Sequence, residues 1–173
     1  MNRSIIQVYT GDGKGKTTAA IGLAARAAGN DMNVLIIQFM KADPTGERIS
    51  LKNIDDVKIE NYGFSDFLKK GKIKEKDILE VKEGFKRAIR AMEQENWDIL
   101  ILDEINVVLD LELLELDNFI DFLRRYGEKK VEIILTGRNA PQEIIELASL
   151  VTEMKCIKHP YEEGLQARKG IEY

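Results

Sequence analysis

The sequence predicts an α/β fold of three layers, in which helices cover both faces of a mostly parallel central sheet. Apolar runs that suit strands alternate with amphipathic helical patterns along the whole chain. Several of these runs are apolar at almost every position, as expected of strands that are buried on both faces. A sheet of this kind binds its ligands at the carboxyl ends of its strands.

The N-terminal half of the chain contains strands, helices and two long loops. The predicted elements are, in order, a strand over residues 3–9, a helix over 16–28, a strand over 33–39, a loop over 41–48, a short strand over 57–61, a loop over 62–71 and a helix over 74–96. Gly29 ends the first helix, and Pro44 and Gly46 mark the first loop. In the long helix, apolar residues recur every three or four positions, which places one of its faces on the core.

The C-terminal half continues the alternation. The predicted elements are a strand over 98–103, a helix over 112–126, a strand over 131–136, a helix over 141–147 and a strand over 150–154. Four polar residues, Thr10, Gln38, Asp103 and Thr136, fall at the ends of predicted strands. We therefore expect them to lie on one rim of the sheet, with the strand of Asp103 next to the first strand.

Size and composition favour a single domain over residues 1–173. The chain has 44% hydrophobic and 32% charged residues, a balance typical of globular domains. Its net charge of −4 gives no electrostatic grip on a nucleic-acid backbone, and its 7% aromatic content predicts no base-stacking surface. We therefore expect no nucleic-acid partner.

Cys156 and His159 are each the single residue of their type in the sequence. This excludes an intrachain disulfide framework and a metal site built from several histidines. No apolar signal core follows the N-terminus, and no run approaches the roughly 20 apolar residues of a membrane span. We expect a cytoplasmic protein without a membrane partner.

Residues 10–18, Thr-Gly-Asp-Gly-Lys-Gly-Lys-Thr-Thr, have the composition of a triphosphate-binding loop. Glycines let backbone N–H groups turn toward a phosphate, and the following helix presents its positive end. The pattern G-x-x-x-x-G-K-[ST] is met at Gly15, Lys16 and Thr17 but begins with Thr10, and Gly11 and Gly13 restore the backbone freedom of the missing glycine.

The strand before this loop and the helix after it favour a P-loop NTPase-like (RecA-like) fold. Lys16 supplies a charge for the phosphates, and a threonine hydroxyl can ligate Mg²⁺. The residues predicted to bind ATP in this loop are Gly11, Asp12, Gly13, Lys14, Gly15, Lys16, Thr17 and Thr18.

Asp103 and Glu104 end a strand of four aliphatic residues, where nucleotide-binding domains of this class hold magnesium directly or through water. Together with Thr17 they form a candidate metal site. The other interpretation is that Glu104 only caps a helix that starts near Asn106.

Arg138 follows a predicted strand in the run Thr136-Gly137-Arg138, and its planar guanidinium can reach the phosphates. The alternative is a surface arginine in a turn.

Two loops on the predicted rim carry further candidate residues. Gln38, Lys41, Glu47 and Arg48 either contact a ligand or belong to a solvated polar loop. The aromatic residues of the loop over 62–71 either line a flat ligand or pack back on the sheet.

Taken together, the motifs resemble those of the P-loop corrinoid adenosyltransferases, the ATP:cob(I)alamin adenosyltransferases of cobalamin synthesis and salvage. The matching motifs run in order from about residue 5 to the last residue and are residues 10–20, Gln38-Phe-Met-Lys41, Gly46-Glu47-Arg48, residues 97–104, Thr136-Gly-Arg138, residues 151–154 and residues 170–173. Thr10 in place of the first glycine is also part of that family's loop.

The resemblance implies transfer of the 5′-deoxyadenosyl group of ATP to the cobalt(I) of a reduced corrinoid, with release of tripolyphosphate. Cobalt(I) is itself the nucleophile, so the protein has to position the two substrates and stabilise charge on the leaving triphosphate. The resemblance also implies that the nucleotide lies reversed in the P-loop, which exposes its 5′ carbon.

Carried over by position, the resemblance assigns residues 13–18 to the triphosphate, Thr17 and Glu104 to Mg²⁺, and Arg138 to a terminal phosphate. Lys16 and Arg138 are then the catalytic residues. The implied corrinoid-binding residues are Gln38, Lys41, Glu47, Arg48, Phe64 and Phe67. Asp66 stands where better-known members have Trp, so either Phe67 replaces that Trp or activation of base-on cobalamin is weaker.

The resemblance also implies a homodimer and an electron-donating reductase such as a flavoprotein. Longer relatives have a leading segment that folds over the active site, and here the C-terminal tail over 159–173 is the candidate to close the corrinoid pocket.

Two other functions remain open on the P-loop alone. A P-loop ATPase or small-molecule kinase would transfer the γ-phosphoryl group, with Asp103 or Glu104 orienting the nucleophile. A nucleotide-gated regulatory binding protein would hold ATP or a corrinoid without turnover. The product, which is tripolyphosphate, ADP or none, distinguishes the three functions.

Overall fold

The computed structural model describes residues 5–41, 45–63, 73–127, 129–160 and 164–171. Strands and helices alternate within these ranges, in the order β1 (Ile5–Thr10), α1 (Lys16–Ala28), β2 (Val34–Phe39), α2 (Gly46–Leu51), β3 (Val57–Tyr62), α3 (Glu75–Gln94), β4 (Ile99–Asp103), α4 (Ile105–Asp110), α5 (Leu116–Tyr126), β5 (Glu132–Thr136), α6 (Gln142–Leu147) and β6 (Leu150–Glu153).

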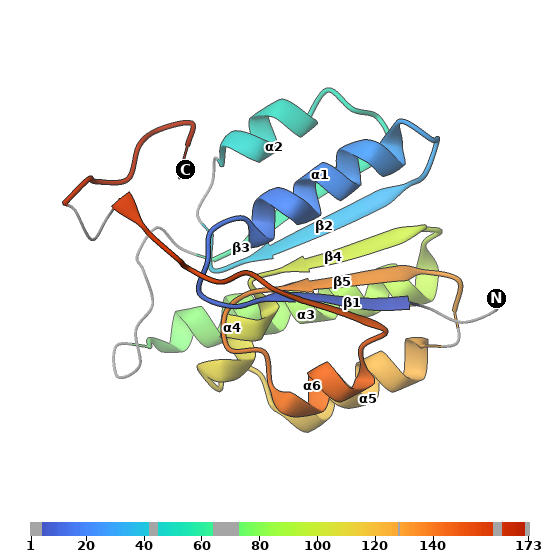
Figure 1. The fold of residues 1–173 in the computed structure, drawn as a ribbon. Coiled ribbons are helices and arrows are strands. Elements are labelled where there is room, and N and C mark those ends of the chain that lie inside the picture. The colour runs from blue at the N-terminus through green and yellow to red at the C-terminus, as the bar shows by residue number, and fades with distance from the viewer. Residues whose placement is uncertain (1–4, 42–44, 64–72, 128, 161–163, 172–173) are drawn as a thin grey trace.

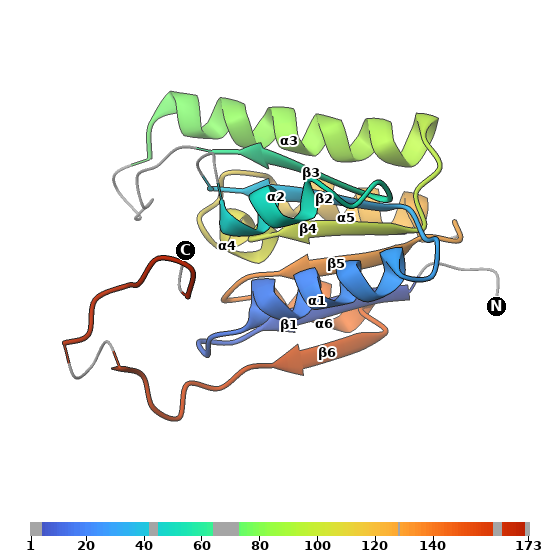
Figure 2. The same cartoon turned by 90° about the horizontal axis from the view of Figure 1, so that it is seen from above.

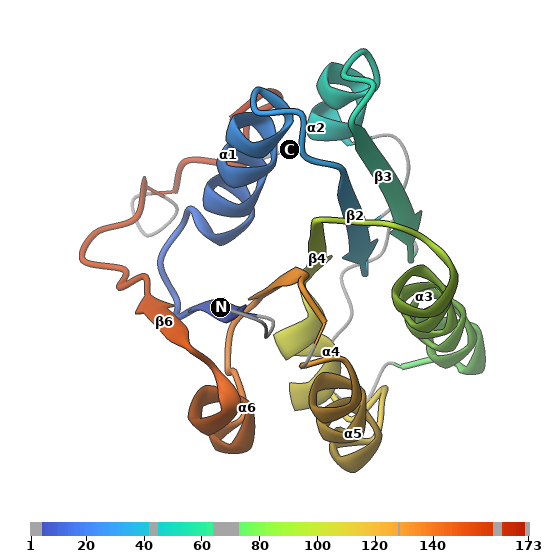
Figure 3. The same cartoon turned by 90° about the vertical axis from the view of Figure 1, so that its right-hand side faces the viewer.

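The strands form one sheet in the order β3-β2-β4-β5-β1-β6, and every pair of neighbours is parallel. Helices α1 and α2 cover one face, and α3, α4, α5 and α6 cover the other (Figure 1). The three layers separate clearly in the view along the strands (Figure 3). The predicted three-layer α/β architecture is therefore confirmed.

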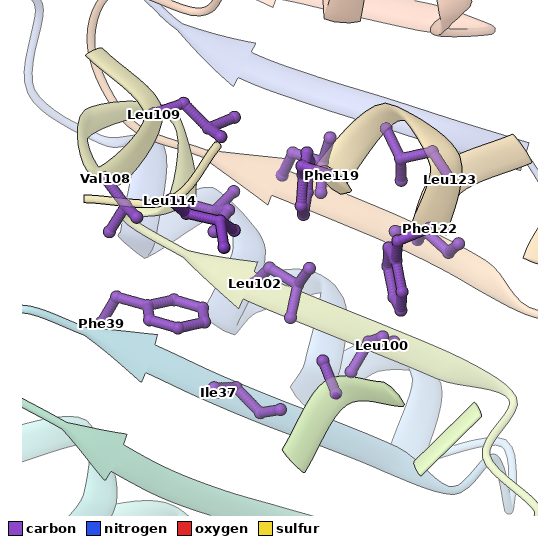
Figure 4. Close-up of a cluster of buried hydrophobic side chains, with 14 of the residues drawn as sticks. Ile37, Phe39, Leu100, Leu102, Val108, Leu109, Leu114, Phe119, Phe122 and Leu123 are labelled. Atoms are coloured by element: carbon purple, nitrogen blue, oxygen red, sulfur yellow. The ribbon is translucent and has the colours of Figure 1, made fainter. Parts of the chain in front are cut away.

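The core differs between the two faces of the sheet. Under α3 to α6, large side chains interdigitate, with Phe119 and Phe122 of α5 facing Leu100 and Leu102 of β4 (Figure 4). On the other face, α1 presents alanines at positions 20, 24 and 27, all buried on the sheet. Because alanine is small, α1 packs close to the strands, and its first turn starts directly above the rim.

Two segments differ from the predicted elements because buried side chains decide their shape. Residues 46–51 form α2, which begins within the loop predicted over 41–48 and extends beyond it, and Leu51 of this helix is buried in the core. The helix predicted over 112–126 begins only at Leu116, after the separate helix α4. Between these helices, Leu113 and Leu114 turn into the core, and Glu112 adopts a φ of 57° that ends the helical path.

The position of β4 also corrects the prediction. Strand β5 lies between β1 and β4, so the strand of Asp103 is not next to the P-loop strand. The reason is the chain path, because β5 returns to the centre of the sheet and pairs with both neighbours. The strands still end at one common edge, and the chain that follows β6 runs at this edge (Figure 2).

Candidate active site

The loop between β1 and α1 is packed tightly against the chain that follows β6. A Cβ atom at Gly11 would lie 2.5 Å from the carbonyl oxygen of Met154, and one at Gly13 would lie 2.7 Å from it. The Gly13 N–H donates to this carbonyl at 2.6 Å, and the Met154 N–H donates to Thr10 at 2.8 Å. Glycine is therefore required at both positions, and Met154 helps to fix the shape of the loop.

Lys16, the first residue of α1, folds its side chain under this loop. Its ammonium donates to the carbonyl oxygens of Gly11 and Gly13, both at 2.7 Å. Burial and the charge of Arg138 lower the pKa of Lys16, and Glu104 and Asp12 oppose this shift. Among the described residues, no side chain caps the start of α1. The loop therefore combines free helix N–H groups with a buried cation, as an anion site requires.

Asp103, the last residue of β4, is 1% exposed and saturated with hydrogen bonds. It accepts them from Thr17 (2.9 Å) and Thr136 (2.6 Å) on Oδ1, and from Gln38 (2.9 Å) and Lys41 (2.6 Å) on Oδ2. Burial alone would raise the pKa of Asp103. The charge of Lys41 and these hydrogen bonds lower it by a larger amount, so the pKa of Asp103 lies below its ordinary value. Asp103 is thus an ionised anchor for its neighbours.

Glu104 follows directly and has very different surroundings. Its backbone has a φ of 65°, in the left-handed region, and its N–H donates to Thr136 Oγ1 at 3.0 Å. Its carboxylate does not cap α4 and has no hydrogen bond to any residue that the structure describes. Burial and the charge of Asp103 raise its pKa, and Lys41, Lys16 and Arg138 oppose this shift. Glu104 therefore occupies the N-cap position of α4, as the capping interpretation expects, but its side chain does not make the capping hydrogen bond.

Arg138 lies in the loop after β5, which is held against α4. A Cβ at Gly137 would lie 3.0 Å from the backbone nitrogen of Val107, and the buried Asn106 side chain donates to the Gly137 carbonyl at 3.2 Å. The Arg138 side chain is exposed, and its charge acts on both Lys16 and Glu104. Three loops, after β1, β4 and β5, thus bring three charged groups to one place.

The side of the site at β2 and α2 is tied together by polar contacts. Gln38 is fully buried and donates to Glu47 at 2.8 Å as well as to Asp103. Lys41 lies 3.4 Å from Glu47 and joins it to Asp103. The β2 end, α2 and β4 end therefore form one network, and Arg48 is half-buried on the same helix.

The structure brings most of the predicted site residues together. Those that meet at the rim are Thr17, Lys16, Asp103, Glu104, Arg138, Gln38, Lys41 and Glu47. Asp12, Lys14 and Thr18 are exposed on the P-loop side. Phe64, Asp66 and Phe67 lie outside the described residues.

Sequence reasoning missed the roles of Met154 and Asn106. Met154 acts through its backbone carbonyl, for which no sequence signal exists. Asn106 followed a recognised acidic pair, but only its complete burial shows that it supports the Arg138 loop.

Two of the three predicted metal ligands fit Mg²⁺ well. Mg²⁺ prefers oxygen ligands and in nucleotide sites uses few protein groups together with phosphates and water. Thr17 donates its hydroxyl proton to Asp103, which leaves oxygen lone pairs on Thr17, and Glu104 has a carboxylate without hydrogen bonds among the described residues. Asp103 already uses both of its oxygens.

A separate hollow of about 410 Å³ lies at the opposite edge of the sheet. It is lined by residues 95–98 and 129–131, among others, and shares no residue with the predicted site. The predicted site residues therefore lie apart from this hollow, at the rim formed by the carboxyl ends of the strands.

Comparisons with known proteins were made for the whole chain. The family model described as ATP:corrinoid adenosyltransferase BtuR/CobO/CobP matches residues 2–173. Corrinoid adenosyltransferases from Sinorhizobium sp and Escherichia coli K12 are each 34% identical over 99% of this chain, covering 81% and 86% of their own lengths. Corrinoid adenosyltransferase CobA of Salmonella typhimurium is 36% identical, with 99% and 86% covered.

Among solved structures, the cytoplasmic domain of EssC aligns with 96% of this chain at a TM-score of 0.58 and 15% identity. This chain spans 34% of that structure's length, and the likeness concerns the fold alone. Of the helices that the structure describes, none combines the length and apolar character needed to cross a membrane.

Proposed function

Since the chain belongs to the ATP:corrinoid adenosyltransferase family, we propose a role for each charged group of its active site in that reaction. The enzyme acts on ATP and a corrinoid in cobalamin biosynthesis. A bond forms between cobalt(I) and the 5′ carbon of ATP, and the bond from that carbon to the triphosphate oxygen breaks. The convergence of Lys16, Glu104 and Arg138 from three loops is the observation that carries the proposal. The comparisons favour neither a kinase nor a regulatory binding protein.

The P-loop would hold the triphosphate through the residues predicted from its motif. Lys16 lies under the loop and would place a positive charge beside the leaving triphosphate. Arg138 is exposed beside it and is free to close on a terminal phosphate. Fixed cations of this kind stabilise the departing polyphosphate more than the ground state, which accelerates the reaction.

Mg²⁺ would be held by Thr17 and Glu104, where it would neutralise charge on the phosphates. The saturated hydrogen bonding of Asp103 supports a role through Thr17, whose hydroxyl it orients. Asp103 would therefore act as a positioning residue, although it was predicted as a ligand. Protein groups supply the remaining contacts to the nucleotide.

The corrinoid would bind beside the end of β2 and α2. Gln38 is fully buried, so it would act by orienting Glu47, while Glu47 and Arg48 lie nearer the surface. Phe64 and Phe67 would contribute the aromatic contacts that the family resemblance implies. The acceptor would be cobalamin or one of its corrinoid precursors.

We propose in addition that residues 1–173 act as one domain and that the cytoplasmic enzyme is a homodimer supplied with electrons by a reductase such as a flavoprotein. An exposed edge supports the dimer, since all four residues of β6 are exposed, including Leu150 at 43% and Val151 at 41%. An unpaired strand edge offers backbone groups that can pair with another chain, and Leu150 and Val151 add exposed apolar side chains there.

The product tests this function. Anaerobic incubation with Mg²⁺, ATP and chemically reduced cob(I)alamin should give a light-sensitive adenosylated corrinoid and an equal amount of tripolyphosphate. Release of ADP and phosphate, with the corrinoid unchanged, would instead show phosphoryl transfer. Repeating the assay with cobinamide identifies the preferred acceptor.

A further inference from the structure

The ammonium group of Lys41 lies among oxygen atoms of the kind that bind metal ions. Its Nζ is 2.6 Å from Asp103 Oδ2, 3.3 Å from Thr17 Oγ1 and 3.4 Å from Glu47 Oε1. Carboxylate and hydroxyl oxygens are the preferred ligands of Mg²⁺. Thr17 is also one of the two metal ligands proposed above. The ammonium therefore stands beside the position that we assign to the metal.

The backbone before Lys41 has an unusual shape. Met40 has a φ of 57°, in the left-handed region, and its N–H donates to Tyr62 at 2.8 Å. Gly63 packs so closely that a Cβ there would lie 2.6 Å from the Met40 Cα. A non-glycine residue in this region costs on the order of 1 kcal/mol, so the surrounding structure holds the turn in place. Lys41 comes directly after this turn and is only 23% exposed, with its ammonium on Asp103.

Lys41 supplies positive charge at the carboxylates of the site without any added ion. Lys16, Lys41 and Arg138 are the cations that act on Glu104. They face the carboxylates of Asp103, Glu104 and Glu47. Asp12 adds a further negative charge near Lys16, but Lys41 is the cation in direct contact with both Asp103 and Glu47. Its ammonium therefore reduces the attraction of these two carboxylates for a free divalent ion.

We propose that the Lys41 ammonium is the resident cation of the metal position in the nucleotide-free protein, so that divalent metal binds only together with ATP. This inference rests on the metal position of the proposed function. The triphosphate supplies additional negative charge that attracts the metal into the site. When Lys41 leaves Asp103, Glu47 on α2 is the other carboxylate that it contacts, so metal binding is coupled to the side of the site where the corrinoid is proposed to bind.

Binding of Mn²⁺ to the nucleotide-free protein tests the proposal, measured as loss of the free Mn²⁺ signal in electron paramagnetic resonance. Lys41→Met removes the charge, Lys41→Gln removes it but keeps a donor for Asp103, and Lys41→Arg preserves it. Lys86→Met is the matched control, since Lys86 is an exposed lysine that pairs with Glu83 on α3. Removal of one positive charge next to two carboxylates should tighten Mn²⁺ binding about tenfold in both neutral Lys41 variants, and leave it unchanged in Lys41→Arg and Lys86→Met.

The double variant Lys41→Met/Asp103→Asn removes both the ammonium and the carboxylate that it contacts. It should therefore lose the gain in Mn²⁺ affinity that Lys41→Met shows alone. Unchanged Mn²⁺ affinity in both neutral Lys41 variants would overturn the proposal, as would an equal gain in Lys86→Met.

A parallel titration with ATP present tests the proposed function separately. ATP-dependent Mn²⁺ binding that Glu104→Gln weakens supports the metal position, even if the Lys41 variants gain nothing. ATP-dependent binding that Glu104→Gln leaves intact would overturn the metal position and, with it, the role of Lys41.

Discussion

Two buried ion pairs at different places on the sheet have similar components but different surroundings. Lys41 pairs with Asp103 at the carboxyl end of β4, and Arg87 of α3 pairs with Glu60 of β3 at 3.0 Å. Asp103 is 1% exposed and Arg87 is 6% exposed, so burial alone does not distinguish the two pairs.

The pair on α3 belongs to a self-contained network. Arg87 donates through Nε to both oxygens of Glu60 and through Nη2 to Glu95 at 2.9 Å. Tyr62 donates to Glu60, and Trp97 donates to Glu95. Each carboxylate therefore has several donors, and the network ties α3 to the edge of the sheet.

The pair at the rim is next to a carboxylate that lacks such donors. Asp103 has four hydrogen bonds, while Glu104 has none from its side chain to the described residues and has a left-handed backbone. We infer from the comparison that a carboxylate without hydrogen-bond donors among the described residues, on left-handed backbone, indicates the proposed metal position better than a buried ion pair as such.

Lys16→Ala should have the largest effect on turnover. It removes the cation under the P-loop, and loss of a group that stabilises the leaving charge should reduce kcat about a thousandfold. The adenosylated corrinoid formed per minute measures this effect, with Lys86→Ala on the surface of α3 as the control. If the variant kept most of its activity, the proposal that the P-loop lysine stabilises the leaving triphosphate would be contradicted.

Arg87→Met should act on stability instead of chemistry. Breaking a buried pair leaves Glu60 and Glu95 without their shared partner and should lower the free energy of unfolding by about 3 kcal/mol. Urea denaturation measures the change, and turnover per folded molecule should stay near that of the unaltered protein. If a fully folded Arg87→Met variant lost kcat selectively, the α3 network would also contribute to turnover, which contradicts its proposed role in stability alone.

Glu104→Gln should show the opposite behaviour. The variant should lose about a hundredfold in turnover at low Mg²⁺, because a neutral amide is a poorer ligand than a carboxylate. The stability of the variant should not fall, because the substitution removes a buried charge that has no hydrogen bonds to the described residues and is costly to bury. The readouts are initial rate against Mg²⁺ concentration and thermal melting, with the exposed Glu143→Gln on α6 as the control. Full activity combined with lower stability would show that Glu104 is structural.

The smallest expected effect is the pH dependence of the α3 network. Burial alone would raise the pKa of Glu60. Lys58 and Arg87 lower it by a larger amount, so the folded-state pKa of Glu60 lies below the ordinary value of 4.5. The stabilisation is therefore present above pH 4.5 and is lost as the pH falls through the lower folded-state pKa. The stability difference between the unaltered protein and Glu60→Gln should shrink over this acidic range, and a difference that grows there would contradict the sign of the shift.

The sequence was sufficient for the strands and for the rim at their carboxyl ends, because both depend on strong local patterns, but it did not place β5 between β1 and β4. Apolar runs fix β2 and β4 as buried strands, and their register then places Gln38 beside Asp103. It was insufficient for α2 and for the break before α5, where burial of single leucines overrides weak local signals.

The same limit applies to the site. The P-loop motif predicts Lys16 and Thr17 because their spacing is tied to phosphate binding. It does not predict that Asp103 is saturated while Glu104 is not, because that difference depends on Thr136, Gln38 and Lys41, which meet only in the folded chain. The neighbouring acids are alike in sequence and differ only in their contacts.

A crystal structure of the protein with Mg²⁺ and ATP would test the account most directly. We predict that the triphosphate lies in the P-loop and that Thr17 and Glu104 bind the metal. Asp103 should remain hydrogen-bonded to Thr17, and the Arg87 network should be unchanged. Metal bound by Asp103, with Glu104 turned away from the nucleotide, would contradict the central claim that the carboxylate without hydrogen-bond donors holds the metal.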